Sequence, residues 1–273
     1  MRELQREIIA ELGVQPSIDP ASEVEKRVDF LVNYCLATKT KGFVLGISGG
    51  VDSSLGGRLA QLAVERLREQ GHEATFVAVR LPYRIQVDED DAQAALRFIQ
   101  PDRVVTFNIG DAVDAFEQEY DRSVAMQMSD FTKGNTKARL RMVAQYAIAG
   151  DEHLLVIGTD HAAEAVTGFY TKYGDGGADL TPLSGLNKRQ VRSLVSYLGG
   201  EESVAMKVPT ADLLDKNPGR ADEDELGLRY ADIDDYLEGQ DVNESAAQKI
   251  ETMFLRTRHK RTMPVTPWET WWK

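Results

Sequence analysis

The feature that most constrains the fold is the stretch GFVLGISGGVDSSLGGRLAQL, residues 42–62, in which a short apolar run stops at two adjacent glycines. The run before the glycines, residues 42–48, has the length and composition of a strand buried in a parallel sheet. The residues after them, 53–71, have helical periodicity and end at a glycine. Glycines between a strand and a helix let the backbone come close to a ligand. The sequence therefore predicts a strand, a tight turn and a helix in direct succession.

The same alternation of strand and helix continues along the chain. Further strands are expected at 74–82, 103–109 and 153–159, with a last short strand at 204–209. Helices are expected at 2–12, from Asp19 or Ser22 to 38, and at 88–99, 111–124, 135–150 and 186–199. This order predicts an α/β fold, a single-domain doubly wound parallel sheet flanked by helices. One domain is expected over 1–273, with N-terminal helices at 1–40 and a C-terminal helix and tail at 240–273 packed on it.

Composition and charge exclude several classes of function. The 273 residues carry a formal net charge of −12, which repels nucleic-acid phosphates and anionic lipid. Cys35 is the only cysteine, so an intramolecular disulfide is excluded. The charged start lacks the apolar core of a signal peptide, and no apolar run reaches the roughly 20 residues that span a bilayer. We therefore expect a soluble, cytoplasmic protein with no nucleic-acid or membrane partner.

The glycine turn SGGVDS, residues 48–53, has the chemistry of a pyrophosphate site. The free N–H groups and the positive dipole end of the following helix attract an anion, and the serine hydroxyls add donors. Asp52 would repel a bare phosphate, so its presence suggests a bridging cation, most simply Mg²⁺. A Walker A loop is excluded because no lysine follows the glycines, and a dinucleotide fingerprint is excluded by their spacing. The alternative is a tight turn with a serine cap.

These residues resemble a known family. SGGVDS resembles the pyrophosphatase loop of ATP enzymes that release pyrophosphate, a superfamily that includes NAD, GMP and asparagine synthetases and several tRNA-modifying enzymes. The segment VIGTDHAAEAVTGFYTKYGDGGADLTPLSGLNKRQV, residues 156–191, closely resembles the ammonia-dependent NAD synthetases. IDPASEVEKRVDFL near the N-terminus, KVPTADLL at 207–214 and HKRTMPVTP at 259–267 agree with that pattern. The likeness implies an adenine nucleotide alpha hydrolase-like, Rossmann-like sheet.

The resemblance also implies roles for individual residues. It implies ATP-binding roles for Gly46, Ile47, Ser48, Gly49, Gly50, Val51, Asp52, Ser53, Arg80, Gln86, Thr159, Lys188 and Thr210. It implies deamido-NAD contacts for Arg139, Lys172, Asp179, His259 and Lys260. Mg²⁺ would be held by Asp52 and Glu164. Asp175 is expected to receive ammonium and take its proton, and Lys188 to neutralise charge on the departing pyrophosphate.

Each of these assignments has a plainer alternative. Glu164 could lie on a solvated helix face, and the GDGGAD sequence at 174–179 could be only a glycine turn. The RTRHKR cluster at 256–261 could do no more than complement the dipole of a helix. The polar segments 84–91 and 213–227 are candidate lids over the site or plain surface loops.

The implied reaction is a two-step amidation. The nicotinate carboxylate of deamido-NAD takes AMP from ATP and releases pyrophosphate, and ammonia then displaces AMP to give NAD⁺. Cys35 has no motif around it and is read as a core thiol, so free ammonia rather than glutamine is the expected nitrogen donor. The family implies a homodimer, in which Tyr34, Phe131 and Phe169 could serve the interface or stack on a substrate ring, and they could equally be core residues. The competing hypotheses are another adenylating member, such as a tRNA thiolase, and a sensor that binds ATP without turnover.

Overall fold

The computed structural model describes residues 1–84, 89–210, 215 and 221–272, and its centre is a parallel sheet. The strands are β1 (Gly42–Gly46), β2 (Thr75–Arg80), β3 (Arg103–Thr106) and β4 (Leu155–Val156). Their order across the sheet is β3-β2-β1-β4, and all the pairs are parallel. The predicted α/β fold with a helix-flanked parallel sheet is therefore confirmed.

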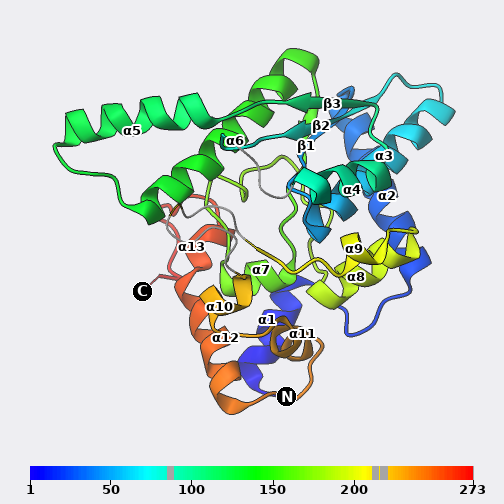
Figure 1. Ribbon diagram of the computed structural model, residues 1–273. Coiled ribbons are helices and arrows are strands. Elements are labelled where there is room, and N and C mark those ends of the chain that lie inside the picture. Colours follow the sequence, from blue (N-terminus) through cyan, green and yellow to red (C-terminus); the bar gives the residue numbers. More distant parts are fainter. Residues whose placement is uncertain (85–88, 211–214, 216–220, 273) are drawn as a thin grey trace.

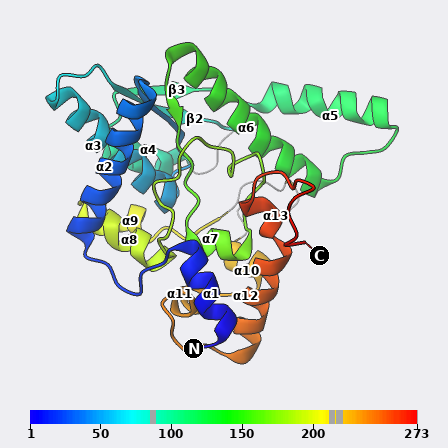
Figure 2. The ribbon, with the colours of Figure 1, turned by 180° about the vertical axis from the view of Figure 1, so that it is seen from behind.

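Successive side chains of the strands enter two different hydrophobic layers. Phe43 and Leu45 of β1 pack on one face, and Val44 packs on the other. The first face is covered by α2 (Pro20–Thr38), α3 (Val51–Glu69), α4 (Glu89–Ile99), α8 (Lys188–Tyr197) and α9 (Glu202–Ala205). The second face is covered by α6 (Asp130–Glu152) and the start of α5 (Gly110–Val124). Beyond its start, α5 extends away from the body of the molecule (Figures 1 and 2).

A third hydrophobic cluster unites helices from both ends of the chain. Its helices are α1 (Glu3–Leu12), α7 (Ala162–Thr167), α11 (Tyr230–Leu237) and α12 (Glu244–Arg256). The short helices α10 (Asp222–Leu226) and α13 (Arg258–Arg261) lie beside them (Figure 1). This cluster surrounds α7, which follows β4 directly, so it supports one wall of the region beyond the strand ends.

The strand order creates a switch point between β1 and β4. From β1 the chain adds β2 and then β3 on one side, and it returns to add β4 on the other side of β1. The Ile157 amide donates to the Val44 carbonyl at 3.0 Å, so the segments that leave β1 and β4 run side by side. Ligands of open α/β sheets bind in the crevice at such a point.

Several predicted elements differ from the observed ones. The strand predicted at 204–209 is wrong, because Val204 and Ala205 belong to α9 and are buried in the first hydrophobic layer. The strand predicted at 153–159 is shorter than expected, although Ile157 adds a single bridge to Leu180. Helix α6 begins five residues earlier than the predicted start, where Ser129 accepts a hydrogen bond from the Thr132 amide.

Two predicted helix positions are confirmed. The N-terminal helix predicted at 2–12 is observed as α1. Of the two caps considered for α2, Asp19 is the one used, because its carboxylate accepts the Ser22 amide at 2.9 Å. In the part of the chain that the structure describes, no helix is long and apolar enough to cross a membrane.

Candidate functional site

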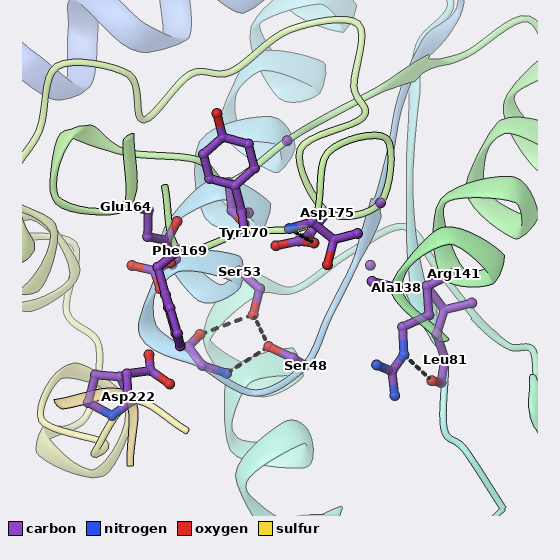
Figure 3. Close-up of a pocket in the computed structure, with 18 of the residues that line it drawn as sticks. Ser48, Ser53, Leu81, Ala138, Arg141, Glu164, Phe169, Tyr170, Asp175 and Asp222 are labelled. Carbon is purple, nitrogen blue, oxygen red and sulfur yellow. Dashed lines mark hydrogen bonds between the residues drawn. The ribbon is translucent and has the colours of Figure 1, made fainter. Parts of the chain in front are cut away.

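The glycine turn connects β1 to α3 and is held by its own serines. Gly49 has φ +87°, and a Cβ there would lie 2.8 Å from the Ala92 backbone nitrogen. The Gly50 amide donates to Ser48 Oγ at 3.2 Å, and Ser53 Oγ donates to the Gly50 carbonyl at 3.1 Å (Figure 3). Gly50 is the N-cap of α3 and has no side chain with which to cap it. The first N–H groups of α3 are therefore available to an anion.

This turn lines a cavity of about 430 Å³, large enough for a nucleotide. Its other walls come from the end of β2, the N-terminal half of α6, the segment from Ile157 to Gly177 and residues around Thr210 and Asp222 (Figure 3). The structure thus brings the predicted ATP-binding residues at the end of β1 and in the turn, except Gly49, around one space together with Thr159 and Thr210. Phe131 and Phe169 line it too, whereas Tyr34 lies on α2 beside Phe30.

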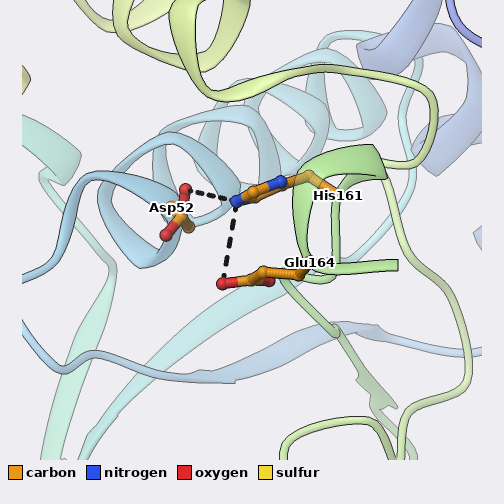
Figure 4. Close-up of side chains that lie close together, drawn as sticks. All are labelled: Asp52, His161 and Glu164. Carbon is orange, nitrogen blue, oxygen red and sulfur yellow. Dashed lines mark ion pairs between the residues drawn. The ribbon is translucent and has the colours of Figure 1, made fainter. Parts of the chain in front are cut away.

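A group of potential metal ligands lies at the switch point. Donor atoms of Asp52, His161 and Glu164 all lie within 4.8 Å of one another (Figure 4). His161 Nε2 is 3.3 Å from Asp52 Oδ1 and 3.6 Å from Glu164 Oε1. The two carboxylates come from the segments after β1 and β4, so the topology explains their meeting. Their oxygens fit a hard cation such as Mg²⁺, for which imidazole is the poorer ligand.

Lys188, at the first position of α8, reaches the same group. Its ammonium is fully buried and lies 2.8 Å from Asp52 Oδ2 and 3.1 Å from His161 Nε2. Asn187 fixes the start of this helix, because it accepts the Gln190 amide while Gln190 accepts the Asn187 amide. The sequence thus places a positive charge on a rigid helix end beside the acid of the glycine turn.

The electrostatics of these carboxyls differ sharply. Burial favours protonation of Asp52, but the charges of Lys188 and His161 outweigh it and hold the pKa of Asp52 below its usual range. Burial raises the pKa of Glu164 to about 8, and burial with the nearby Asp175 and Asp52 raises the pKa of Asp160 to about 8. The pocket holds more acids than it can keep charged by itself, which favours a bound cation.

Asp175 and Lys260 occupy another wall of the cavity. Asp175 Oδ1 accepts the Thr171 amide at 2.9 Å, and burial raises the pKa of its carboxyl. Lys260 Nζ donates to the carbonyls of Gly168 and Tyr170 at 2.7 Å each. Both side chains line the cavity with the glycine turn, so a substrate in it could meet all three.

The other predicted site residues in the described part of the chain, Lys188 among them, are not among those that line the cavity. Arg139 donates to the Lys172 carbonyl at 3.3 Å, and Lys172 Nζ donates to the His259 carbonyl, which makes one exposed basic group. Asp179 accepts the Val156 amide at 2.8 Å and so supports β4. Arg80 is buried and pairs with Glu89 at 2.8 Å. Gln86 lies outside the described residues, as do residues 85–88, 213–214 and 216–220 of the two candidate lids.

Sequence reasoning overlooked three residues of this region. His161 stands three positions before Glu164, a spacing that puts both on one side of a helix start and could have been noticed. Asp222 lines the cavity, and Tyr230 lies beside Lys188. Asp222 and Tyr230 are 34 and 42 positions beyond Lys188, and no local pattern connects them to it.

Comparisons with known proteins agree with this architecture. The NAD synthase family model matches residues 23–264. The chain is 62% identical over 272 residues to an NH(3)-dependent NAD(+) synthetase of Leifsonia xyli, with 100% of this chain and 98% of the relative covered. Among solved structures, an NAD+ synthetase from Burkholderia pseudomallei aligns with TM-score 0.82 and 47% identity over 95% of this chain and 96% of that one. An NMN synthetase from Francisella tularensis aligns with TM-score 0.81 and 34% identity over 93% and 100%. The chain belongs to the NAD synthase family.

Proposed function

We propose that this protein is an ammonia-dependent NAD⁺ synthetase that acts on deamido-NAD. The observation that carries the proposal is the convergence of a glycine turn, the pair Asp52 and Glu164, and Asp175 on one cavity in a member of the NAD synthase family, with Lys188 buried behind Asp52. The first two features suit the polyphosphate of ATP, and the third is a partly desolvated acid suited to proton transfer.

The first step is adenylation of the substrate carboxylate. A nicotinate carboxylate oxygen attacks the α-phosphorus of ATP, the bond to the β-phosphate oxygen breaks, and pyrophosphate leaves. The α3 N–H groups and the buried ammonium of Lys188 stabilise the charge that develops on the phosphates. Exclusion of water from the cavity during the reaction would protect the mixed anhydride from hydrolysis.

The second step is amidation. Ammonia attacks the acyl carbon, AMP leaves with the bonding electron pair, and a proton is lost from nitrogen. Asp175 lies on the cavity wall and would accept this proton or bind the incoming ammonium. Cys35 is buried, and its thiol donates a hydrogen bond to the Thr40 carbonyl with Sγ 3.3 Å from the oxygen, which suits a structural thiol rather than a glutaminase nucleophile.

The proposed metal is Mg²⁺ held by Asp52 and Glu164. When bound there, the cation would supply positive charge that neutralises part of the charge of the ATP phosphates. The chain's own contribution is to present two carboxylates from neighbouring strand ends and to keep Asp52 ionised through Lys188.

We also propose that the protein works as a homodimer in the cytoplasm. The projecting α5 and the start of α6 expose apolar side chains that a monomer would leave in water, namely Phe116, Val124, Met126 and Phe131. The exposed basic group of Arg139, Lys172 and His259 would then bind part of the dinucleotide near this surface. Both nucleotide substrates are highly charged molecules that occur inside cells, which supports the proposed cytoplasmic location.

The decisive experiment follows pyrophosphate release and NAD⁺ formation from ATP by the purified protein, with deamido-NAD and ammonium each added or omitted. We expect pyrophosphate only with deamido-NAD, and NAD⁺ only when ammonium is also present. Nicotinate mononucleotide and tRNA serve as alternative acceptors. Activity with either of these in place of deamido-NAD would contradict the proposal, and ATP binding without any pyrophosphate would favour a sensor.

A variant pair tests the assigned chemistry. Lys188→Met should reduce pyrophosphate release by about 10²–10³-fold, because a buried charge at the leaving group is lost. Lys26→Met removes a largely exposed lysine that pairs only with Glu23 one helical turn away among the contacts of the described residues. It should leave the rate unchanged, so equal losses in both variants would contradict the role of Lys188.

A further inference from the structure

Tyr230 is a buried aromatic residue that contacts the buried lysine of the site. It is the first residue of α11 and is 3% exposed. The Lys188 ammonium lies 4.8 Å from the centroid of its ring, within the range of an attractive cation–π contact. This contact is stronger in a desolvated place than at a surface. Lys188 is therefore surrounded by the carboxylate of Asp52, the imidazole of His161 and an aromatic ring.

The hydroxyl of Tyr230 points to a second part of the cavity. It donates to Asp222 Oδ2 at 3.3 Å, and Asp222 lines the cavity (Figure 3). The Asp222 amide donates to the Pro209 carbonyl at 3.1 Å, next to the bridge between Thr210 and Ala221. One side chain thus connects the lysine at the start of α8 with the cavity wall around Thr210.

We propose that Tyr230 is a positioning residue that holds the Lys188 ammonium toward the triphosphate of ATP and ties it to the wall formed by Asp222 and Thr210. Its ring limits where the flexible lysine side chain can place its charge. Its hydroxyl keeps Asp222 at a fixed place beside that charge. The proposal rests on the proposed function in one respect, the contact of Lys188 with phosphate.

The role makes a specific prediction about ligand preference. A group that acts through Lys188 affects binding of the β- and γ-phosphates and not binding of the adenosine monophosphate part. We expect Tyr230→Leu to weaken binding of α,β-methylene-ATP about tenfold, with less than a twofold change for AMP, measured by calorimetry with Mg²⁺ present. Tyr230→Phe keeps the ring, so it should retain most of the preference for the triphosphate.

The matched control lies on the same helix. Tyr236 is also buried, and its hydroxyl donates to Glu251 at 3.1 Å, a residue that does not line the cavity. Tyr236→Phe and Tyr236→Leu should change stability without changing the ratio of the two affinities. If Tyr230→Leu does not fold, Tyr230→Met offers another side chain without a ring.

A double-mutant cycle decides whether Tyr230 acts through the lysine. Lys188→Met should lose the triphosphate preference, and adding Tyr230→Leu should cost little more. Independent, additive losses would overturn the proposal, as would equal weakening of both ligands by Tyr230→Leu. Failure of the proposed function gives a different result, since the wild-type protein would then release no pyrophosphate with deamido-NAD whatever the affinity ratios.

Discussion

Gly49 shows how strongly a single residue of the nucleotide turn is constrained. Its φ of +87° is costly for any residue with a Cβ, and a Cβ would press on the backbone of Ala92. We expect Gly49→Ala to lower the free energy of unfolding by about 2–4 kcal/mol, the sum of backbone strain and overpacking. The measurement is urea unfolding of the ligand-free protein.

The control for this prediction is Gly71, which has a similar φ of +84° but no atoms within 4 Å of the place that a Cβ would occupy. Gly71→Ala should therefore cost only about 1 kcal/mol, the strain alone. If the two alanine variants lost equal stability, the close approach of the turn to α4 would make no measurable contribution to the free energy of unfolding.

At Asp175 the two half-reactions can be separated. Asp175→Asn keeps an oxygen that can accept the Thr171 amide but removes the base. In this variant we expect the first turnover to release pyrophosphate as fast as in the wild type. The steady-state rate of NAD⁺ formation should fall by about 10²–10⁴-fold. Rapid-quench kinetics measures both steps. Equal loss of both, or unchanged NAD⁺ formation, would remove the proposed role in ammonia chemistry.

Among the elements, α8 connects helix capping with the site. Asn187 caps the helix, is fully buried and also donates to Glu238 at 2.8 Å. Asn187→Ala should cost about 1–2 kcal/mol of stability. Because Lys188 is the next residue, the KM for ATP should also rise several-fold in steady-state assays.

The cap of α2 provides the comparison. Asp19 caps that helix at the surface, away from the cavity. Asp19→Ala should cost about 1 kcal/mol and leave the KM for ATP unchanged. A matching rise in KM in both variants would mean that the effect of Asn187 reflects general destabilisation.

Elements whose signals are local could be predicted from the sequence. The strand–turn–helix unit at 42–71 depends on an apolar run, a glycine pair and helical periodicity in adjacent residues. The family likeness implies Asp52 and Glu164 as the two acids of a magnesium site, but only the structure shows that their carboxylates lie close together. The helical conformation of Val204 and Ala205, within the strand predicted at 204–209, could not be predicted from the sequence. Tertiary packing of these two residues on neighbouring helices decided between helix and strand.

Contacts that arise only from the packing of distant elements could not be predicted from the sequence. Tyr230 reaches Lys188 because α11 packs between α1, α7 and α8. The apolar pattern of α11 predicts only that one side of this helix is buried, not which residues it contacts. The pairing of Arg80 with Glu89 has the same origin, since nothing near either residue indicates its partner.

At the scale of the whole molecule, the switch point lies between two parts, the sheet with its helical layers and the all-helical cluster of α1, α7, α11 and α12. The sheet and its two helical layers hold the glycine turn rigidly, whereas the cluster of α1, α7, α11 and α12 supports Glu164 and Tyr230. The cavity lies where these parts meet, so its charges are shared between them. Stability of the complete chain should therefore respond to the charge state of the cavity.

The last prediction concerns pH. The pKa is raised to about 8 for Asp160 and Glu164 and to about 6 for Asp222, in each case first by burial. In the unfolded chain the same groups titrate near pH 4. Between about pH 4 and 8 these three groups therefore bind more protons in the folded protein than in the unfolded chain, so their contribution makes the free energy of unfolding fall as pH rises. The slope is at most about 1.4 kcal/mol per pH unit for each extra proton.

Thermal unfolding of the metal-free, ligand-free protein should accordingly show a Tm that decreases from about pH 5 to about pH 8. Glu164→Gln removes one of the raised groups and should flatten this profile near its upper end. Added Mg²⁺ should raise the Tm more at pH 8 than at pH 5, because a cation beside Asp52 and Glu164 favours their ionised forms and binds best when both are charged. A Tm that increases with pH over this range would show that the buried acids are charged and paired in the folded protein, and the electrostatic argument for a cation in this cavity would then fail.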